Sequence, residues 1–455
     1  MNSLTDGLTP KLRYIRQRYA GCSSRDISKW NTSEVVDMSY LFEDYSGDIP
    51  DISKWNTANV RTMKGMFKGY KGKMPNIAGW NTNAVEDMSF MFMNCEKMKT
   101  INIKRWRTPS LKYMDYMFAN CFAIEELDLD GFNTSKVKSM DSLFYNCFSL
   151  NKIRNSHWNT ANVENMRRMF SFCRSLTEIN LGNFTTPKVK DMSHLFHNCS
   201  KIKVLDLDTF NTHELTDMKG LFSGCVKLEK ISWRRLNTRK VSNMKAVFSR
   251  CYKLEEIDLR NFDTRNVTDM SFLFNDCIIL KEIDVSNFDT GFVTDMDSMF
   301  RGCASVEELD LDNFNTGLVT DMGHMFSHCQ ELRYLDLTGF DTTHVQYMDS
   351  MFESCYELID LKLFGFRTNN VENMMNMFSC CRNLVSLDLS TFTSFRLHYC
   401  SRLFADCTSL IEIKCDFFYF NLGLVHEHRM MFDNTPNVPM YIQKRLEDFV
   451  YEEDF

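Results

Sequence analysis

The sequence predicts an α/β repeat solenoid in which each turn of chain holds one short strand and one short helix. Three observations support it: an aromatic-x-Thr triplet recurs every 25 or 26 residues, an alternating apolar segment precedes each triplet, and an apolar helical stripe follows it. From Trp80 to Phe392 every step is 26 residues. Because this period is held without a gap, each repeat is a unit that tolerates no insertion. The repeats predict about 16 turns, with parallel strands on the concave face.

The alternating segment of each repeat predicts the strand. In the repeat of residues 254–277, Ile257 and Leu259 alternate with Asp258 and the other polar residues around them. A period of two is typical of a strand with one buried face.

The second half of each repeat predicts the helix. Apolar residues that follow the triplet recur at i, i+3, i+6, i+7 and i+10, which places them on one helical face. In the same repeat they are Val267, Met270, Leu273, Phe274 and Cys277.

The threonine of the triplet is predicted to cap this helix. Proline follows it directly at Thr108 and Thr186, and proline is favoured at the first helical position. Threonine is a common N-cap residue, so the same role is expected of Thr264, Thr290 and Thr316.

Stacked strands on one side and thicker helices on the other define leucine-rich-repeat architecture. The composite pattern L-x-x-[IL]-D-L-x-x-F-[ND]-T-x-x-V-x-x-M-x-x-[ML]-F-x-x-C covers about residues 25–435. It resembles the repeat of the BspA-like leucine-rich-repeat surface proteins, known from bacterial and mycoplasmal surface lipoproteins. The resemblance implies an adhesin at the cell surface that binds proteins of a host or of a neighbouring cell.

The composition limits the compartment and the classes of partner. The net charge is −7 and the sequence pI is about 5.9, so the chain lacks the basic footprint of a nucleic-acid-binding protein. No apolar run approaches the roughly 18 residues of a membrane span. The first residues show no apolar signal-peptide core, which favours a cytoplasmic location, whereas the family resemblance favours the surface.

Most of the 17 cysteines belong to one column that runs from Cys95 to Cys407 in steps of 26 residues. Free cysteine behaves as a small apolar residue, and disulfides between neighbouring repeats would distort a regular stack. We therefore expect buried, reduced thiols, and the absence of a C-x-x-C motif argues against structural zinc. We expect no cofactor. A thiol-dependent enzyme is a remote alternative, with Cys22 and Cys400 as candidate nucleophiles.

The repeat framework does not dictate the outward strand positions, so a binding surface is sought there. Aspartates occupy the central outward position of four consecutive repeats, and like charges side by side are destabilising. The predicted partner-binding residues are Glu256, Asp258, Glu282, Asp284, Glu308, Asp310, Asp312 and Asp336. They would receive a basic peptide segment or divalent cations. The alternative is a solvated face whose aspartates accept hydrogen bonds from nearby backbone N–H groups.

An open stack needs caps, because its end coils are apolar and its strand edges are unpaired. Residues 1–24 are predicted as an N-terminal cap with an amphipathic helix over 9–20. Residues 25–435 form the solenoid, and residues 436–455 hold a C-terminal cap helix and an acidic tail.

These features together predict a non-enzymatic scaffold for protein–protein interaction or adhesion, which presents a rigid concave surface to a protein partner. An intracellular scaffold, viral or related to virulence, is the alternative. The sequence identifies neither the partner nor the oligomeric state.

Overall fold

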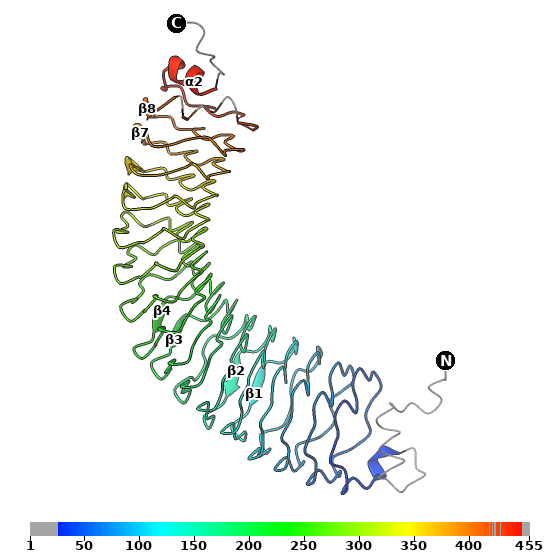
Figure 1. The fold of residues 1–455 in the computed structure, drawn as a ribbon. Helices are drawn as coiled ribbons and strands as arrows, with labels where there is room; N and C mark the ends of the chain where they lie inside the picture. The colour runs from blue at the N-terminus through cyan, green and yellow to red at the C-terminus, as the bar shows by residue number, and fades with distance from the viewer. Residues whose placement is uncertain (1–25, 418, 421, 423–424, 428, 448–455) are drawn as a thin grey trace. The chain divides into compact units, whose positions relative to one another are not determined.

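In each of its two units the chain forms a parallel β-solenoid whose coils lie side by side (Figure 1). Paired residues of neighbouring coils are 26 positions apart in the regular part, as Glu126 and Lys152 are. This computed structural model describes residues 26–417, 419–420, 422, 425–427 and 429–447. The predicted N-terminal cap lies outside the described residues.

The coils belong to two compact units. The first comprises Met1–Leu215 and Gly224–Leu236, and the second comprises Thr216–Ser223 and Asn237–Phe455.

Short strands pair in parallel between successive coils. Within the described residues the pairs are β1 (Glu126–Asp128) with β2 (Lys152–Arg154), β3 (Val204–Asp206) with β4 (Lys230–Ser232), β5 (Tyr334–Asp336) with β6 (Asp360–Lys362), and β7 (Ser386–Leu389) with β8 (Glu412–Cys415). In β7 the exposed and buried residues alternate, as the sequence pattern predicts. The segment 254–259 has the same alternation, with Leu259 buried and Asp258 exposed, but it forms no regular strand.

The predicted helix of each repeat is wrong, because a run of turns takes its place. In the coil of residues 254–277, Phe272 and Asp276 both have φ of 58°, in the left-handed region. A right-handed helix requires negative φ throughout, so these two residues exclude it. The N–H of Phe272 donates instead to the carbonyl of Asp297 in the next coil, at 2.8 Å. Helical structure in the described chain is limited to the 3-10 turn η1 (Ile27–Lys29) and the helix α2 (Met440–Glu447).

Hydrogen bonds between coils explain why the repeat length is constant. Along this run of turns, alternate residues donate to the carbonyl 25 positions ahead, as Phe274 does to Met299 at 2.8 Å. The residues between them close local turns, as Leu273 does with the carbonyl of Met270 at 3.2 Å. An inserted residue would shift one whole ladder by one position, so that buried backbone groups would lose their partners.

The triplet threonine joins coils and caps no helix. The side chain of Thr290 is buried, and its hydroxyl donates to the carbonyl of Asn315 in the next coil at 2.9 Å. The N–H of Asn315 donates back to the same hydroxyl at 2.8 Å. The predicted N-cap role of Thr108, Thr186, Thr264, Thr290 and Thr316 is therefore wrong, because no helix follows them. The turn after Thr290 is closed by Asp289, whose carboxylate accepts the N–H of Gly291 at 3.0 Å.

The interior of each unit consists of columns of like side chains. The rings of Phe274 and Phe300 stack with centroids 5.8 Å apart and planes 11° from parallel. The Met and Cys columns are buried beside them, and the thiol of Cys277 donates to the carbonyl of Phe248 at 3.3 Å. The predicted inward positions are thus confirmed, although a helix does not carry them.

The helix α2 follows the last coil of the second unit (Figure 1). Its apolar residues Ile442 and Leu446 are buried, and the carbonyl of Leu446 accepts the N–H of Leu422 at 3.1 Å. The helix predicted within residues 436–455 is present over residues 440–447, and its role as a cap stays a prediction.

Candidate functional site

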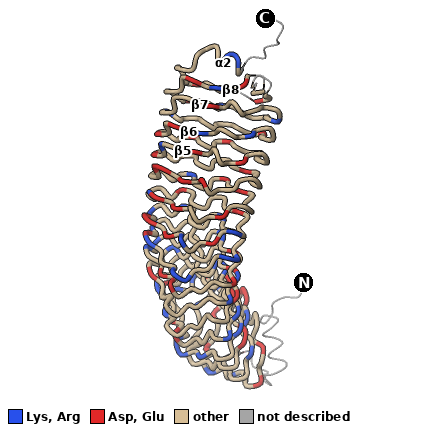
Figure 2. Tube along the Cα trace, turned by 60° about the vertical axis from the view of Figure 1, so that its left-hand side comes forward, with Lys and Arg blue, Asp and Glu red and all other residues tan. Residues whose placement is uncertain are grey.

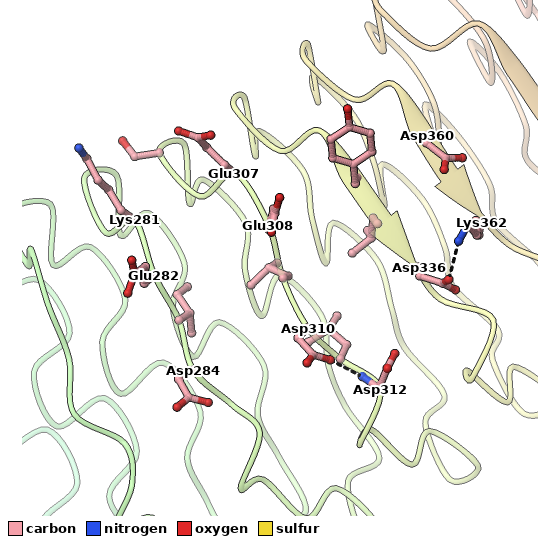
Figure 3. A pocket seen from close by; sticks show the side chains of 16 residues that line it. Lys281, Glu282, Asp284, Glu307, Glu308, Asp310, Asp312, Asp336, Asp360 and Lys362 are labelled. Atoms are coloured by element: carbon pink, nitrogen blue, oxygen red, sulfur yellow. Dashed lines mark hydrogen bonds and ion pairs between the residues drawn. The ribbon is translucent and has the colours of Figure 1, made fainter.

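A groove of about 820 Å³ lies over four successive coils of the second unit (Figure 3). Six of the eight predicted residues line it: Glu282, Asp284, Glu308, Asp310, Asp312 and Asp336. They project from the strand β5 and from the equivalent segments of the coils before it (Figure 3). The groove is therefore built by the same position in successive coils, brought together by the stacking.

The remaining two predicted residues, Glu256 and Asp258, lie one coil earlier and do not line the groove. The guanidinium of Arg260 holds the carboxylate of Asp258 through two hydrogen bonds of 2.9 and 2.7 Å. These bonds lower the pKa of Asp258 to about 2. The charge of Asp258 is therefore balanced within its own coil.

Sequence reasoning missed several residues of the groove. Glu307, Tyr334 and Asp360 line it, as do Lys281 and Lys362. A strict alternation would bury Glu307, because its neighbour Glu308 is exposed. Both side chains are exposed, since the alternation begins only at Glu308. Two adjacent polar residues such as Glu307 and Glu308 are therefore a sequence signal for two exposed positions in one coil.

The aspartates at the central outward position also stabilise a turn within their own coil. The carboxylate of Asp284 accepts the N–H of Ser286 at 3.1 Å and its hydroxyl at 2.6 Å, and these bonds lower the pKa of Asp284. The carboxylate of Asp310 accepts the N–H of Asp312 at 3.1 Å. Such turns are a common structural role of aspartate, as the solvated-face alternative expects. The same hydrogen bonds fix the carboxylates in position.

Asp336 has a second partner across the coils. It accepts hydrogen bonds from the hydroxyl of Thr338 at 2.7 Å and from the ammonium of Lys362 at 3.0 Å, which lower its pKa to about 2. Lys362 is thus a counter-charge that the sequence reasoning did not find.

The charge of the groove is strongly unbalanced. Eight carboxylates line it, against the two ammonium groups of Lys281 and Lys362. Elsewhere along the coils that carry β5 to β8, acidic and basic residues are interspersed (Figure 2). The excess of negative charge therefore has a defined location.

Metal binding and thiol chemistry find no support among the described residues. No group of three His, Cys, Asp or Glu side chains there is arranged to hold a metal ion. Cys400 is fully buried, and burial raises its pKa to about 12, so it is no nucleophile at neutral pH. Cys22 lies outside the described residues. Within the described part of the chain, no helix has the length and the apolar character that crossing a bilayer requires.

The coils of about 26 residues, their buried columns and the open groove define a leucine-rich-repeat-like solenoid, a class typical of binding proteins. The chain belongs to the family described as "Mycoplasma protein of unknown function, DUF285", as the expected resemblance to mycoplasmal repeat proteins implies. The family model matches residues 12–127, 113–232, 190–283, 242–359, 280–385 and 325–444.

Solved structures with similar folds include leucine-rich-repeat proteins. One from Bacteroides ovatus is 20% identical, with a TM-score of 0.40, over 73% of this chain and 83% of that one. A leucine rich cell surface protein from Faecalibacterium prausnitzii is 16% identical, with a TM-score of 0.28, over 73% and 83% of the two chains. None of the curated proteins matches the sequence.

Proposed function

We propose that this protein is a non-enzymatic interaction scaffold whose acidic groove binds a basic segment of a partner protein. The observation that carries the proposal is the charge of the groove, eight carboxylates against two lysines on one open surface. A surface of one sign attracts a partner of the opposite sign and raises the rate of association.

The carboxylates of the groove are suited to bind basic side chains. Asp284 and Asp310 accept hydrogen bonds from their own turns, which hold each carboxylate in one orientation. A carboxylate has about four lone-pair sites, so each retains capacity for a Lys or Arg side chain. The exposed ring of Tyr334 lies among them and offers an aromatic contact of the kind that is enriched in interfaces.

The test is to change Asp284→Asn and Asp310→Asn together. Asparagine preserves the turn, because Asn180 occupies the equivalent position and accepts the N–H of Gly182 at 3.1 Å. The change therefore removes charge without removing the fold. Binding of a labelled arginine-rich peptide, followed by fluorescence anisotropy at low salt, should weaken about tenfold, because two charge pairs of roughly 0.7 kcal/mol each are lost.

Asp206→Asn is the matched control. It makes the same turn, with the N–H of Asp208 at 3.0 Å, but lies in the first unit and outside the groove. Peptide affinity should be unchanged in this variant. Equal affinity of the double variant and the parent protein would refute the proposal.

A further inference from the structure

A column of exposed aliphatic side chains continues the wall of the groove. In successive coils of the second unit, the position just before the alternating segment holds Glu255, Lys281, Glu307 and Arg333, and then Ile359, Val385 and Ile411. Lys281 and Glu307 line the acidic groove. The character of this position therefore changes from charged to aliphatic along one continuous surface.

The last three residues, here called the aliphatic column, lie directly before the strands β6, β7 and β8. Their side chains are exposed: Ile359 by 45%, Val385 by 43% and Ile411 by 53%. The N–H of Ile411 donates to the carbonyl of Val385 at 2.9 Å, so the two side chains lie side by side.

Folding does not require aliphatic residues at this position. The interior under the column is already filled by Leu358, Leu384 and Leu410, which are fully buried. The preceding coils fold with charged residues at the same place. Adjacent exposed apolar residues are a recognised mark of an interaction surface.

We propose that the aliphatic column is the second half of the partner-binding surface, and that the partner segment carries basic residues followed by apolar residues. This inference rests on the proposed function of the groove and names the chemistry of its partner. The charge of the groove selects the basic half of the segment, and the column binds the apolar half.

The spacing of the coils suits a helical segment. Neighbouring coils lie about 4.8 Å apart, so the surface from Lys281 to Ile411 spans roughly 24 Å. A helix of about 16 residues has that length, and its residues at i and i+4 repeat every 5–6 Å, close to the coil spacing. Helix-in-groove binding of this kind uses apolar anchors at i, i+3 and i+4 positions.

The experiment compares two synthetic helical peptides of about 16 residues. The first has arginines in one half and leucines in the other, and the second has glutamines in place of the leucines. Against the parent protein, the leucine peptide should bind at least about tenfold more tightly, because three aliphatic side chains become buried. A protein with Ile359→Thr, Val385→Thr and Ile411→Thr should lose this preference and keep its affinity for the glutamine peptide.

Threonine retains the β-branched shape of these positions, and an unchanged unfolding midpoint verifies the fold. Val204→Thr is the matched control, since Val204 is 58% exposed at the first residue of β3 in the first unit. This control should keep the preference for leucine.

The outcomes separate the two proposals. Equal affinity of the two peptides for the parent protein overturns the inference about the column, while binding of the glutamine peptide still supports the groove. Leucine-dependent binding without any binding of the glutamine peptide supports the column and refutes the groove. A dimer of the parent protein in light scattering that the triple variant abolishes overturns the proposed occupant, because a second copy would then cover the column.

Discussion

The hydroxyl of Thr264 makes two hydrogen bonds to the backbone of a single residue in the next coil, Asp289. It accepts the N–H of Asp289 at 2.7 Å and donates to its carbonyl at 2.9 Å. Thr264 is buried, so both backbone groups of Asp289 depend on this side chain. The same exchange recurs along each unit and fastens one coil to the next.

Replacing this threonine should loosen the stack. Thr264→Val keeps the shape of the side chain but removes both hydrogen bonds to the backbone of Asp289. We expect a loss of about 2 kcal/mol in the free energy of unfolding, measured by urea denaturation. Thr268→Val is the control, because Thr268 is exposed and makes one longer bond, to the carbonyl of Ser242 at 3.2 Å. A loss no larger than that of the control would show that the threonine column does not hold the coils together.

The cysteine column should be chemically inert in the folded protein. Cys329 is fully buried, and burial raises its pKa to about 12, so almost no reactive thiolate exists at neutral pH. Mass spectrometry after brief iodoacetamide treatment should find the column unmodified, whereas Cys380, which is partly exposed, should be alkylated. In guanidinium chloride the whole column should react. Rapid labelling of Cys329 without denaturant would contradict its burial.

A cluster of carboxylates in the second unit should make stability depend on pH. Burial raises the pKa of Asp321 to about 6, and the charges of Asp297, Asp295 and Asp349 act in the same direction. The folded state therefore binds the proton more tightly than the unfolded chain, whose aspartates titrate near 3.9. The stabilisation is complete below about pH 4 and is lost as the pH rises through about 6.

Asp321→Asn tests this sign. The amide oxygen can still accept the N–H of Gly323, which Asp321 accepts at 2.9 Å. Because the side chain is partly solvated, we expect the variant to be only about 1 kcal/mol more stable than the parent at pH 8, with the difference disappearing near pH 4. Asp284→Asn is the opposite case. The pKa of Asp284 is lowered, so its ionised carboxylate stabilises the folded state at pH 8, and this variant should be no more stable than the parent there. Equal pH profiles of Asp321→Asn and the parent would sink the prediction.

One coil carries a polar residue inside the aliphatic core. Asn155 is buried at the position that Leu129 and Leu181 occupy in the adjacent coils. Its amide nitrogen donates to the carbonyl of Asn180 at 3.1 Å, but its Oδ1 accepts no hydrogen bond among the described residues. A buried acceptor without a partner costs about 1–3 kcal/mol.

Asn155→Leu should therefore raise the free energy of unfolding by about 1 kcal/mol, after the loss of the bond to Asn180 is subtracted. Thermal and urea denaturation measure the gain. Leu129→Asn, the reverse change one coil earlier, should destabilise by about 2 kcal/mol or more. A destabilised Asn155→Leu protein would indicate that a polar residue is needed in this coil.

The acidic groove was only partly predictable. The sequence places Asp284, Asp310 and Asp336 on one column, and the stacked coils do bring them together. Arg260 is the one counter-charge that the sequence suggests within this group, and it does pair with Asp258. The sequence did not reveal that Lys362 reaches Asp336 from the next coil. The orientation of a long side chain depends on its neighbours in space, which a repeat pattern does not specify.

The sequence contained a signal for the turns, but the spacing of the apolar residues favoured a helix instead. Of the residues at positive φ, many are Asn or Gly, such as Asn94, Asn120, Gly69 and Gly224. These residue types tolerate the left-handed region best. Their recurrence four residues after another left-handed position marks a run of turns.

The sequence by itself determined the length of the coil and the side chains that fill the interior. A strict period of apolar residues means that each residue packs on its own equivalent, as Phe274 does on Phe300. The tertiary structure alone decided the backbone within each coil. Turns prevail over a helix because N–H groups such as that of Phe272 find their acceptors one coil away, and a local pattern carries no information about a partner 25 residues distant.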